Sequence, residues 1–339
     1  MRVWYNRTFS SVYAAIKLIR EADTENRFTL IHSNPNRHTP AAALAHEFHV
    51  EPTGLKGDAY VDWCLAFCRQ HRVDIFVPGR EATLLAAEHA RFADIGTRVL
   101  SAAPAPMLHL IHDKARFYAE TVLPHAPVAA FRRFENIEEF DAAWAALRPH
   151  HAQLCVKPSH SIYGLGFAVV DEQRSSAALL LAGVEYHVGY ADLRRGLAEL
   201  GQFRTMLLME FLDGPEYSVD CVGDHGRLVS AVVRRKLAQP GSGQLIDMRR
   251  AILDATASLC AAHALNGVFN VQFKEGGGRP RLLEINPRMS GGIGMACLAG
   301  PNLPYLALRG FANGFGELTV PPVRDGMRVA EVNTATVLA

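Results

Sequence analysis

Short apolar segments alternate with amphipathic segments along the first hundred residues. The apolar runs predict β-strands at residues 3–5, 28–31 and 74–77. Apolar positions spaced three or four residues apart predict helices at residues 11–19, 41–48 and 60–68, and a further helix that begins near Glu81. Strands and helices that alternate in this way predict an α/β domain, in which a parallel sheet carries helices on both faces.

Polar residues follow two of these strands, at the sheet edge where α/β proteins bind their ligands. They are Asn6, Arg7, Thr8 and Ser10 after the first strand, and Gly79, Arg80 and Glu81 after residues 74–77. Helix capping and ligand binding both account for such residues, and the sequence leaves the two explanations open.

The pattern changes after residues 102–106, Ala-Ala-Pro-Ala-Pro, which predict a domain boundary. Beyond it, strands are predicted at residues 128–134, 153–157, 167–171, 206–212, 217–222, 228–235, 268–274 and 281–285. Helices are predicted at residues 138–147 and 245–263, with further helical segments before residue 200. Consecutive strands favour antiparallel hairpins, so this part of the chain is predicted to be α+β.

The composition narrows the class of protein. The 339 residues suggest about two domains, and 35 Lys and Arg against 34 Asp and Glu give a formal net charge of +1. This balance argues against a general nucleic-acid-binding protein, which needs a surplus of basic residues. The chain has no apolar run of roughly 18 residues and its N-terminus turns polar early, so we expect no membrane span and a cytoplasmic location.

The cysteines and histidines lack the spacing of a metal site. No two cysteines form a CxxC pair, so we expect reduced and mostly buried thiols rather than disulfides or a zinc site. His46 and His49, and likewise His109 and His112, have helical spacing without a third ligand, which favours solvated or capping histidines.

The densest chemical pattern is a predicted hairpin over residues 269–288, with Gly276, Gly277 and Gly278 at its turn. Strand alternation puts Glu284 and Asn286 on one face, and Gln272 of the partner strand can face the same way. These side chains offer a carboxylate and two amide oxygens, the ligands that Mg²⁺ takes, and Arg288 follows with a guanidinium suited to phosphoryl oxygens. The alternative is a solvated hairpin face.

Two strings of this hairpin, Phe-Asn-Val-Gln-Phe at residues 269–273 and Glu-Ile-Asn-Pro-Arg at residues 284–288, resemble the ATP-grasp superfamily. They are most similar to the large subunit of carbamoyl phosphate synthetase. The resemblance implies an α/β pre-ATP-grasp domain with a parallel sheet at residues 1–105, followed by two α+β lobes at residues 106–204 and 205–339 that sandwich ATP. The opening segment, residues 2–11, also resembles ATP-grasp proteins found with bacterial tellurite-stress operons.

The resemblance implies roles for residues outside the hairpin. Lys114 takes the place of a phosphate-binding lysine, and Lys157 that of a lysine contacting the α-phosphate and adenine. The segment from Ser159 to Gly166, with Gly164, takes the place of a phosphate-covering loop. Glu210, Phe211 and Leu212 would meet the adenine, and Glu216 would approach the ribose or the metal. Ordinary alternatives are an exposed lysine beside an N-cap for Lys114 and a β-turn after Leu212.

Two further segments carry candidate anion-binding groups. Strand alternation sends Arg234 and Lys236 to one face and Arg235 to the other, and one of the three is expected to contact the γ-phosphate or an acyl phosphate. A solvated strand end is an equal alternative. The small residues at 290–294 allow a backbone anion site for the acceptor carboxylate or acyl phosphate.

Together these residues imply an ATP-dependent carboxylate–amine ligase. A carboxylate would become an acyl phosphate and then react with an amine, and ADP and phosphate would be released. Two Mg²⁺ ions, with Mn²⁺ as an alternative, would be held by Gln272, Glu284 and Asn286. The other hypotheses are an ATP-grasp kinase of small molecules and a non-catalytic nucleotide-binding module. The expected partners are small molecules, without nucleic acid or membrane, and a homodimer is left open.

Overall fold

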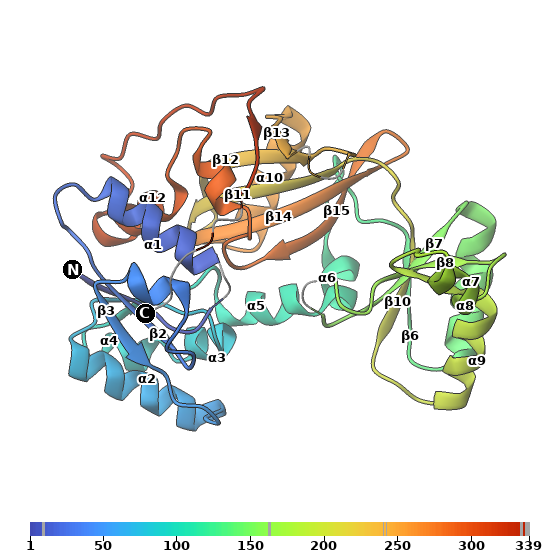
Figure 1. The fold of residues 1–339 in the computed structure, drawn as a ribbon, viewed down its shortest axis with the longest axis horizontal. Coiled ribbons are helices and arrows are strands. Elements are labelled where there is room, and N and C mark those ends of the chain that lie inside the picture. Colours follow the sequence, from blue (N-terminus) through green and yellow to red (C-terminus); the bar gives the residue numbers. More distant parts are fainter. Residues whose placement is uncertain (9–10, 162–163, 240, 242, 333–334, 336–339) are drawn as a thin grey trace. The chain divides into compact units, whose positions relative to one another are not determined.

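The computed structural model describes residues 1–339 except 9–10, 162–163, 240, 242, 333–334 and 336–339, so Ser10 lies outside the described residues (Figure 1). The chain divides into two units. Unit 1 comprises Met1–His109, Pro215–Gln272 and Glu284–Ala339, and unit 2 comprises Leu110–Gly214 and Phe273–Leu283. The resemblance implies three consecutive segments instead, at residues 1–105, 106–204 and 205–339. Unit 1 is interrupted twice, by residues 110–214 and by residues 273–283. The second interruption is the turn end of the predicted hairpin, whose two strands belong to a sheet of unit 1.

The first sheet of unit 1 is parallel, as predicted. Its strands are β1 (Arg2–Tyr5), β2 (Thr29–Asn34), β3 (Glu47–Val50), β4 (Ile75–Val77) and β5 (Arg98–Val99). They lie in the order β3-β2-β1-β4-β5. The chain therefore extends the sheet in opposite directions from β1. This arrangement opens a crevice outside the carboxyl ends of β1 and β4, where α/β sheets bind ligands.

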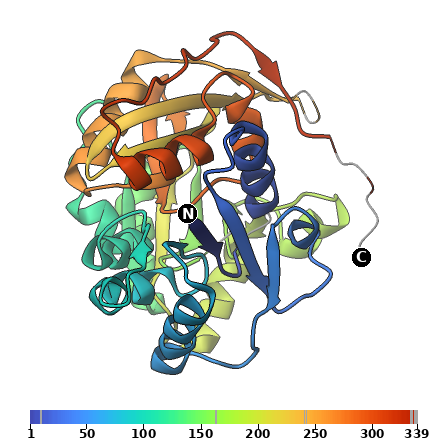
Figure 2. The ribbon, with the colours of Figure 1, turned by 90° about the vertical axis from the view of Figure 1, so that its left-hand side faces the viewer.

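Helices cover both faces of this sheet (Figure 2). They are α1 (Ser11–Ala22), α2 (Gly57–His71), α3 (Ala82–Ala87) and α4 (His89–Ala93). On the α2 side, Trp4 stacks between Phe67 and Phe76, with ring centroids 4.2 Å apart in each pair. On the other side, α1 packs against α12 (Leu303–Asn313) through buried residues such as Ile16 and Leu308.

The predicted helix at residues 41–48 is wrong. The chain forms a short 3₁₀ turn, Pro40–Ala43, and then the edge strand β3. Parallel pairing sets Glu47 beside Ile31 of β2, and His46 Nδ1 accepts a hydrogen bond from the Leu30 amide at 2.9 Å. Satisfying these backbone groups of β2 outweighs the local helical spacing.

The second sheet of unit 1 has the strand order β15-β14-β11-β12-β13-β16. Its strands are β11 (Glu216–Asp224), β12 (Arg227–Lys236), β13 (Gln244–Ile246), β14 (Gly267–Gly276), β15 (Arg279–Asn286) and β16 (Arg328–Val329). The helices α10 (Arg250–Ala262), α11 (Ile293–Cys297) and α12 pack against it. Gly277 and Gly278, with φ of 59° and 74°, form the predicted turn between β14 and β15. Residues 244–246 form a strand where the sequence analysis begins a helix.

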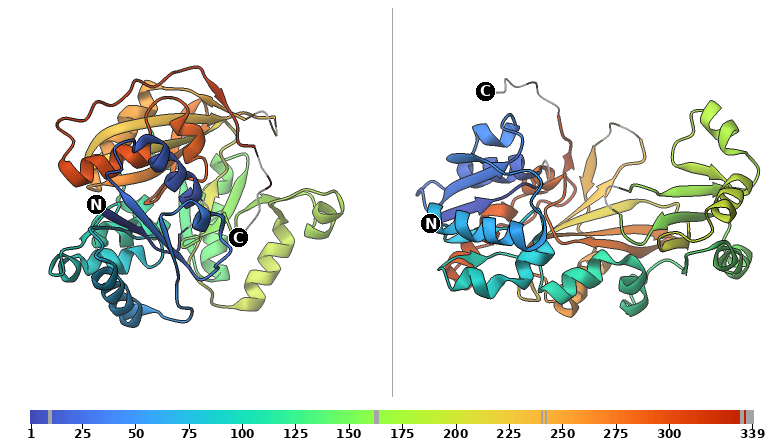
Figure 3. Two further views of the ribbon diagram at one scale, coloured as in Figure 1. Left: turned by 60° about the vertical axis from the view of Figure 1, so that its left-hand side comes forward. Right: turned by 90° about the horizontal axis from the view of Figure 1, so that it is seen from below.

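Unit 2 is built on a mixed sheet with the order β6-β10-β7-β8-β9. Its strands are drawn in green to yellow in Figure 3. The strands are β6 (Phe131–Phe134), β7 (Leu154–Pro158), β8 (Ala168–Asp171), β9 (His187–Gly189) and β10 (Met206–Glu210). The helices are α5 (Ala105–His112), which leads in from unit 1, α6 (Lys114–Glu120), α7 (Ile137–Leu147), α8 (Ser176–Leu181) and α9 (Tyr190–Leu200), with a 3₁₀ turn at Arg148–His150. Because β10 pairs with both β6 and β7, it belongs to this unit, whereas the expected lobe boundary at residue 205 assigns it to the next.

Two expectations about the whole chain agree with the described residues. The six cysteines are free thiols, and five of them are buried; they are Cys64, Cys68, Cys155, Cys221 and Cys260, with Cys297 half-buried. Among the helices that the structure describes, none combines the length and the apolarity needed to cross a lipid bilayer.

Candidate active site

A cluster of oxygen-bearing side chains lies where β14 and β15 run side by side in unit 1. We call Asn270, Glu284 and Asn286 the oxygen cluster. Asn286 Nδ2 lies 3.1 Å from Glu284 Oε1 and 3.5 Å from Asn270 Oδ1. Arg288 Nη2 donates to Asn286 Oδ1 at 3.3 Å, so a guanidinium borders the cluster directly. The structure thus brings together three of the predicted residues, Glu284, Asn286 and Arg288.

Asn270 is the member of this cluster that the sequence analysis did not single out. It is 1% exposed, and its Nδ2 donates to Ser218 Oγ, Val219 O and Asp220 Oδ1 at 2.9, 3.0 and 3.2 Å. Its Oδ1 is therefore oriented toward Asn286. Asn270 is two residues from Gln272 on β14, so strand alternation places both on the same face, and Gln272 is half-buried. This alternation is the sequence signal that points to Asn270.

Arg234 is connected to the oxygen cluster through Asp220, which also binds Asn270. The Arg234 side chain is 2% exposed and its Nε donates to Asp220 Oδ2 at 2.8 Å. Its other donors bond to Gln244 Oε1, and to Ser218 Oγ and Ser290 Oγ at 3.2 and 2.9 Å. This network holds Asp220, the side chain that orients Asn270, and the contact of Arg234 with phosphate stays a prediction.

The last two residues of β12, both basic, form ion pairs near the surface. Lys236 Nζ lies 2.6 Å from Glu216 Oε1, so two predicted site residues pair with each other. Arg235 Nε lies 3.0 Å from Asp247 Oδ2. The predicted roles of Lys236 at a phosphate and of Glu216 at ribose stay predictions.

In unit 2, Lys114 and Ser159 meet at the start of α6. Lys114 is 8% exposed, and its Nζ donates to Ser161 O at 3.0 Å. Ser159 Oγ donates to Asp113 Oδ1 at 2.6 Å and accepts from the Ala115 amide at 3.0 Å. Burial raises the pKa of Asp113, but hydrogen bonds from Ser159 and the backbone outweigh it and hold the pKa below its usual value. Asp113 is also the N-cap, as the ordinary alternative expected.

Lys157, at the end of β7, is held by an aromatic residue of α6. Its Nζ lies 2.7 Å from Tyr118 Oη and 4.9 Å from the centroid of the Tyr118 ring. The Tyr118 hydroxyl in turn donates to Leu283 O. A buried tyrosine therefore fixes the direction of a lysine that would otherwise have several rotamers.

The remaining predicted nucleotide residues of unit 2 lie on β10 and on the loop after β7. Glu210 Oε2 accepts from the Ala130 amide at 3.3 Å, and its Oε1 lies 3.7 Å from His151 Nδ1. Phe211 stacks under Lys274 Nζ, 4.9 Å from its ring centroid, and Leu212 is buried. Gly164 and Gly166 have φ of 68° and 81°, the left-handed region that favours glycine. Residues 162 and 163 of this loop lie outside the described residues.

A pocket of unit 1 opens at the crevice between β1 and β4. Its wall combines the ends of these strands with the segment that follows β15. The lining residues include Tyr5, Thr8, Ser11, Gly79, Leu100, Arg288, Met289 and Leu308. Arg288 therefore connects the pocket to the oxygen cluster through its bond with Asn286.

A buried polar network fixes the two loops that edge this pocket. Asn6 Oδ1 accepts from the Gly79 amide at 2.6 Å, and Asn6 Nδ2 donates to Tyr60 Oη at 2.8 Å. Tyr60 donates to Glu51 Oε1 at 2.8 Å, and Glu51 Oε2 accepts from the Arg7 amide at 3.0 Å. Asn6 thus holds the two loops together through its side-chain hydrogen bonds, and ligand binding by the polar residues around it stays a prediction.

The chain is similar to known proteins in sequence. A family model described as ATP-grasp in the biosynthetic pathway with Ter operon matches residues 202–335. Carnosine synthase 1 of Mus musculus is 39% identical over 104 residues, 27% of this chain and 13% of that protein. The arginine-specific large chain of carbamoyl phosphate synthase from Geobacillus stearothermophilus is 24% identical over 298 residues, 83% of this chain and 25% of that protein. The chain thus spans a quarter or less of the length of these relatives.

The fold is shared with solved structures. An ADP complex of N5-carboxyaminoimidazole ribonucleotide synthetase matches with a TM-score of 0.66 and 15% identity, over 96% of this chain and 79% of that one. An L-amino acid ligase from Bacillus licheniformis matches with a TM-score of 0.60 and 13% identity, over 91% and 73%. A biotin carboxylase domain from Hydrogenobacter thermophilus, solved with MgADP and bicarbonate, matches with a TM-score of 0.63 and 14% identity, over 94% and 71%. At these identities the likeness establishes the fold.

Proposed function

We propose that the chain is an ATP-grasp protein and that it acts as an ATP-dependent ligase joining a small-molecule carboxylate to an amine. The observation that carries the proposal is the oxygen cluster of Asn270, Glu284 and Asn286 with Arg288 bonded to its edge. Relatives named as a carnosine synthase and an L-amino acid ligase support the same class of reaction.

The donor set of the oxygen cluster fits a magnesium ion. One carboxylate and two amide oxygens are hard ligands, which suit Mg²⁺ or Mn²⁺ better than softer metals. Glu284 and Asn286 would hold the metal with Gln272 or Asn270, and two ions are expected. The metal would neutralise charge on the phosphate oxygens of ATP.

The basic residues of unit 2 would bind the nucleotide. Lys114 and Lys157 would hold phosphates, and the backbone amides around Gly164 and Gly166 would cover them. Glu210 with the backbone of Phe211 and Leu212 would meet the adenine. The support for these roles is that each lysine already has an orienting partner, Ser161 O for Lys114 and Tyr118 for Lys157.

The proposed reaction needs no covalent bond to the protein. A carboxylate oxygen of the substrate attacks the γ-phosphorus of ATP, ADP leaves, and an acyl phosphate forms. The amine nitrogen then attacks the acyl carbon, loses a proton and displaces phosphate. Arg288 would bind the carboxylate and then the acyl phosphate, since its fork of donors matches either anion and its side chain also lines the pocket.

The pocket supports a small acceptor rather than a polymer. Its lining is largely apolar, from Tyr5, Leu100, Met289 and Leu308, with hydroxyls at Thr8 and Ser11. We propose that the side chain of one substrate enters this pocket while its reacting group stays near Arg288.

The test is release of ADP from ATP and Mg²⁺ in the presence of pooled carboxylates, pooled amines, or both, with mass spectrometry of the products. A ligase releases ADP fully only with both pools and forms a product heavier than either substrate. A stable phosphorylated product from a single substrate identifies a kinase instead.

Glu284→Gln is the decisive variant, because it removes the carboxylate while keeping the shape. We expect turnover to fall at least about 100-fold, the scale seen when one group that stabilises a transition state is removed. Glu317→Gln is the matched control, since Glu317 is exposed and lies outside the cluster. ADP release by Glu284→Gln equal to that of Glu317→Gln contradicts the proposal.

A further inference from the structure

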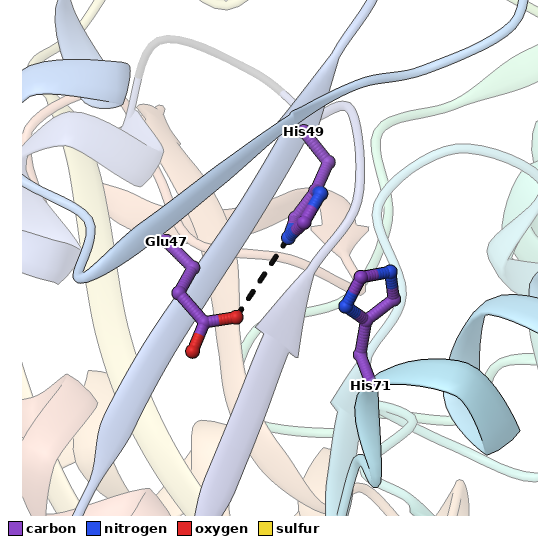
Figure 4. Close-up of side chains that lie close together, drawn as sticks. All are labelled: Glu47, His49 and His71. Atoms are coloured by element: carbon purple, nitrogen blue, oxygen red, sulfur yellow. Dashed lines mark ion pairs between the residues drawn. The ribbon is translucent and has the colours of Figure 1, made fainter.

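A second group of potential ligands lies in unit 1 at β3, an edge strand of the parallel sheet. Glu47 and His49 project from the edge strand β3, and His71 is the last residue of α2. One ligand atom from each of the three lies within 4.8 Å of the other two. In Figure 4 the carboxylate and both imidazole rings face one another.

Strand and helix geometry explain why these residues meet. Glu47 and His49 are two apart on a strand, so they share a face, and this face is covered by α2. The His49 and His71 rings lie 4.2 Å apart between centroids, and both rest against Phe67. The packing of α2 therefore brings the third ligand to the first two.

The Nε2 atom of His49 lacks a hydrogen-bond partner among the described residues. This atom is also buried. The nearest carboxylate oxygen, Glu47 Oε2, is 3.7 Å away, beyond hydrogen-bond distance. Burying a polar nitrogen without a partner costs free energy, and coordination to a metal ion would remove this cost.

We propose that Glu47, His49 and His71 bind a zinc ion that fastens the edge strand β3 to the end of α2. Two imidazoles and one carboxylate are a common zinc donor set with an open fourth position. Zinc bonds of about 2.0–2.1 Å put ligand atoms roughly 3.4 Å apart, so the side chains must close by about 1 Å. The Glu47 and His49 side chains, 34% and 31% exposed, have room to do so.

Arg2 orients the carboxylate and also limits the affinity. Its Nη2 donates to Glu47 Oε2 at 2.7 Å and its Nε to His71 O at 2.6 Å, so it connects two of the ligand residues. Hydrogen-bonded carboxylates of this type are usual around protein metals. The guanidinium charge opposes a cation, which favours a metal with strong imidazole bonds, such as Zn²⁺, over Mg²⁺ or Ca²⁺.

The test is a titration of the tag-free, chelator-treated chain with Zn²⁺ against a chromophoric zinc chelator. One equivalent is expected to bind, and His49→Gln and His71→Gln are each expected to weaken binding about tenfold or more. His46→Gln is the matched control, because His46 lies on the same segment but bonds to the Leu30 amide; its zinc affinity should equal that of the parent chain.

A second readout uses the unmodified chain and so does not depend on whether variants fold. Diethyl pyrocarbonate acylates accessible histidines, and mass spectrometry locates the sites. Zn²⁺ is expected to protect His49 and His71 while leaving the exposed His150 reactive. The proposal is overturned if the chain takes up less than a stoichiometric amount of zinc, if zinc protects neither ring, or if His46→Gln weakens binding as much as His49→Gln.

Discussion

Replacing Arg234 by methionine is expected to be among the most damaging single changes in unit 1. Asp220 is fully buried, and Arg234, 2% exposed, is its counter-ion at 2.7–2.8 Å. Without the guanidinium, the carboxylate keeps Asn270 Nδ2 at 3.2 Å but has lost its neutralising charge. Removing one partner of such a buried pair costs about 3–5 kcal/mol.

The expected change in melting temperature follows from this free energy. For a folding unit of roughly 150–250 residues, 1 kcal/mol corresponds to about 2–4 °C. Arg234→Met should therefore lower the melting temperature of unit 1 by about 6–20 °C, measured by circular dichroism or calorimetry. Adding Asp220→Asn removes the uncompensated charge, so the double variant should be more stable than Arg234→Met alone.

The neighbouring arginine provides the control. Arg235 pairs with Asp247 at 3.0 Å, with the two side chains 31% and 24% exposed. Solvent screens such a pair, so Arg235→Met should cost no more than about 1 kcal/mol. If the two methionine variants melt within 2 °C of each other, roughly the shift for half a kcal/mol to one, the buried pair of Arg234 and Asp220 does not stabilise unit 1 by more than an exposed pair.

Three further predictions test other parts of unit 1. Gly79→Ala should lower the free energy of unfolding in urea by about 1–3 kcal/mol, because a Cβ there would lie 2.2 Å from Thr8 Cβ. Gly316→Ala is the control and should be neutral, because a Cβ there would have no atom within 4 Å. Equal stability of the two variants refutes the close approach at Gly79. Burial lowers the pKa of His32 in the folded chain. As the pH falls below about 6.5, His32 therefore becomes protonated in the unfolded chain first. The free energy of unfolding should decrease with pH until the pH passes the lowered pKa of the folded chain. Urea unfolding at pH 7.5 and 5.5 should show a smaller loss for His32→Phe than for the parent, and an equal loss contradicts the assignment. The buried thiols, whose pKa burial raises, should react with Ellman's reagent much faster in urea than in the native chain, and equal rates would rule out their burial.

Strand alternation was the most reliable guide to the site. It placed Glu284 and Asn286 on one face, and the turn at Gly277 and Gly278 set the hairpin that carries them. Both inferences need only local sequence, because a strand has a period of two and a tight hairpin turn needs positive φ.

The surroundings of the site were harder to predict because they depend on pairing between distant strands. The register of β11 and β12 sets Ser218 opposite Arg234, and β14 lies beside β11. Asp220 is thereby brought to both Arg234 and Asn270. No local pattern contains this information, so the sequence reveals neither the bond between Arg234 and Asp220 nor the place of Asn270 in the cluster.

The zinc proposal depends on β3, a strand of the parallel sheet that lies where the sequence predicts the end of a helix. A helix at residues 41–48 brings together residues three or four apart, which pairs His46 with His49. A strand brings together residues two apart, which pairs Glu47 with His49 and turns His46 toward the Leu30 amide. The third ligand, His71, then comes from α2, whose packing on β3 no spacing in the sequence reveals. The zinc affinities of His46→Gln and His49→Gln therefore distinguish the two local structures as well as testing the site, since a helix requires both histidines and the strand requires only His49.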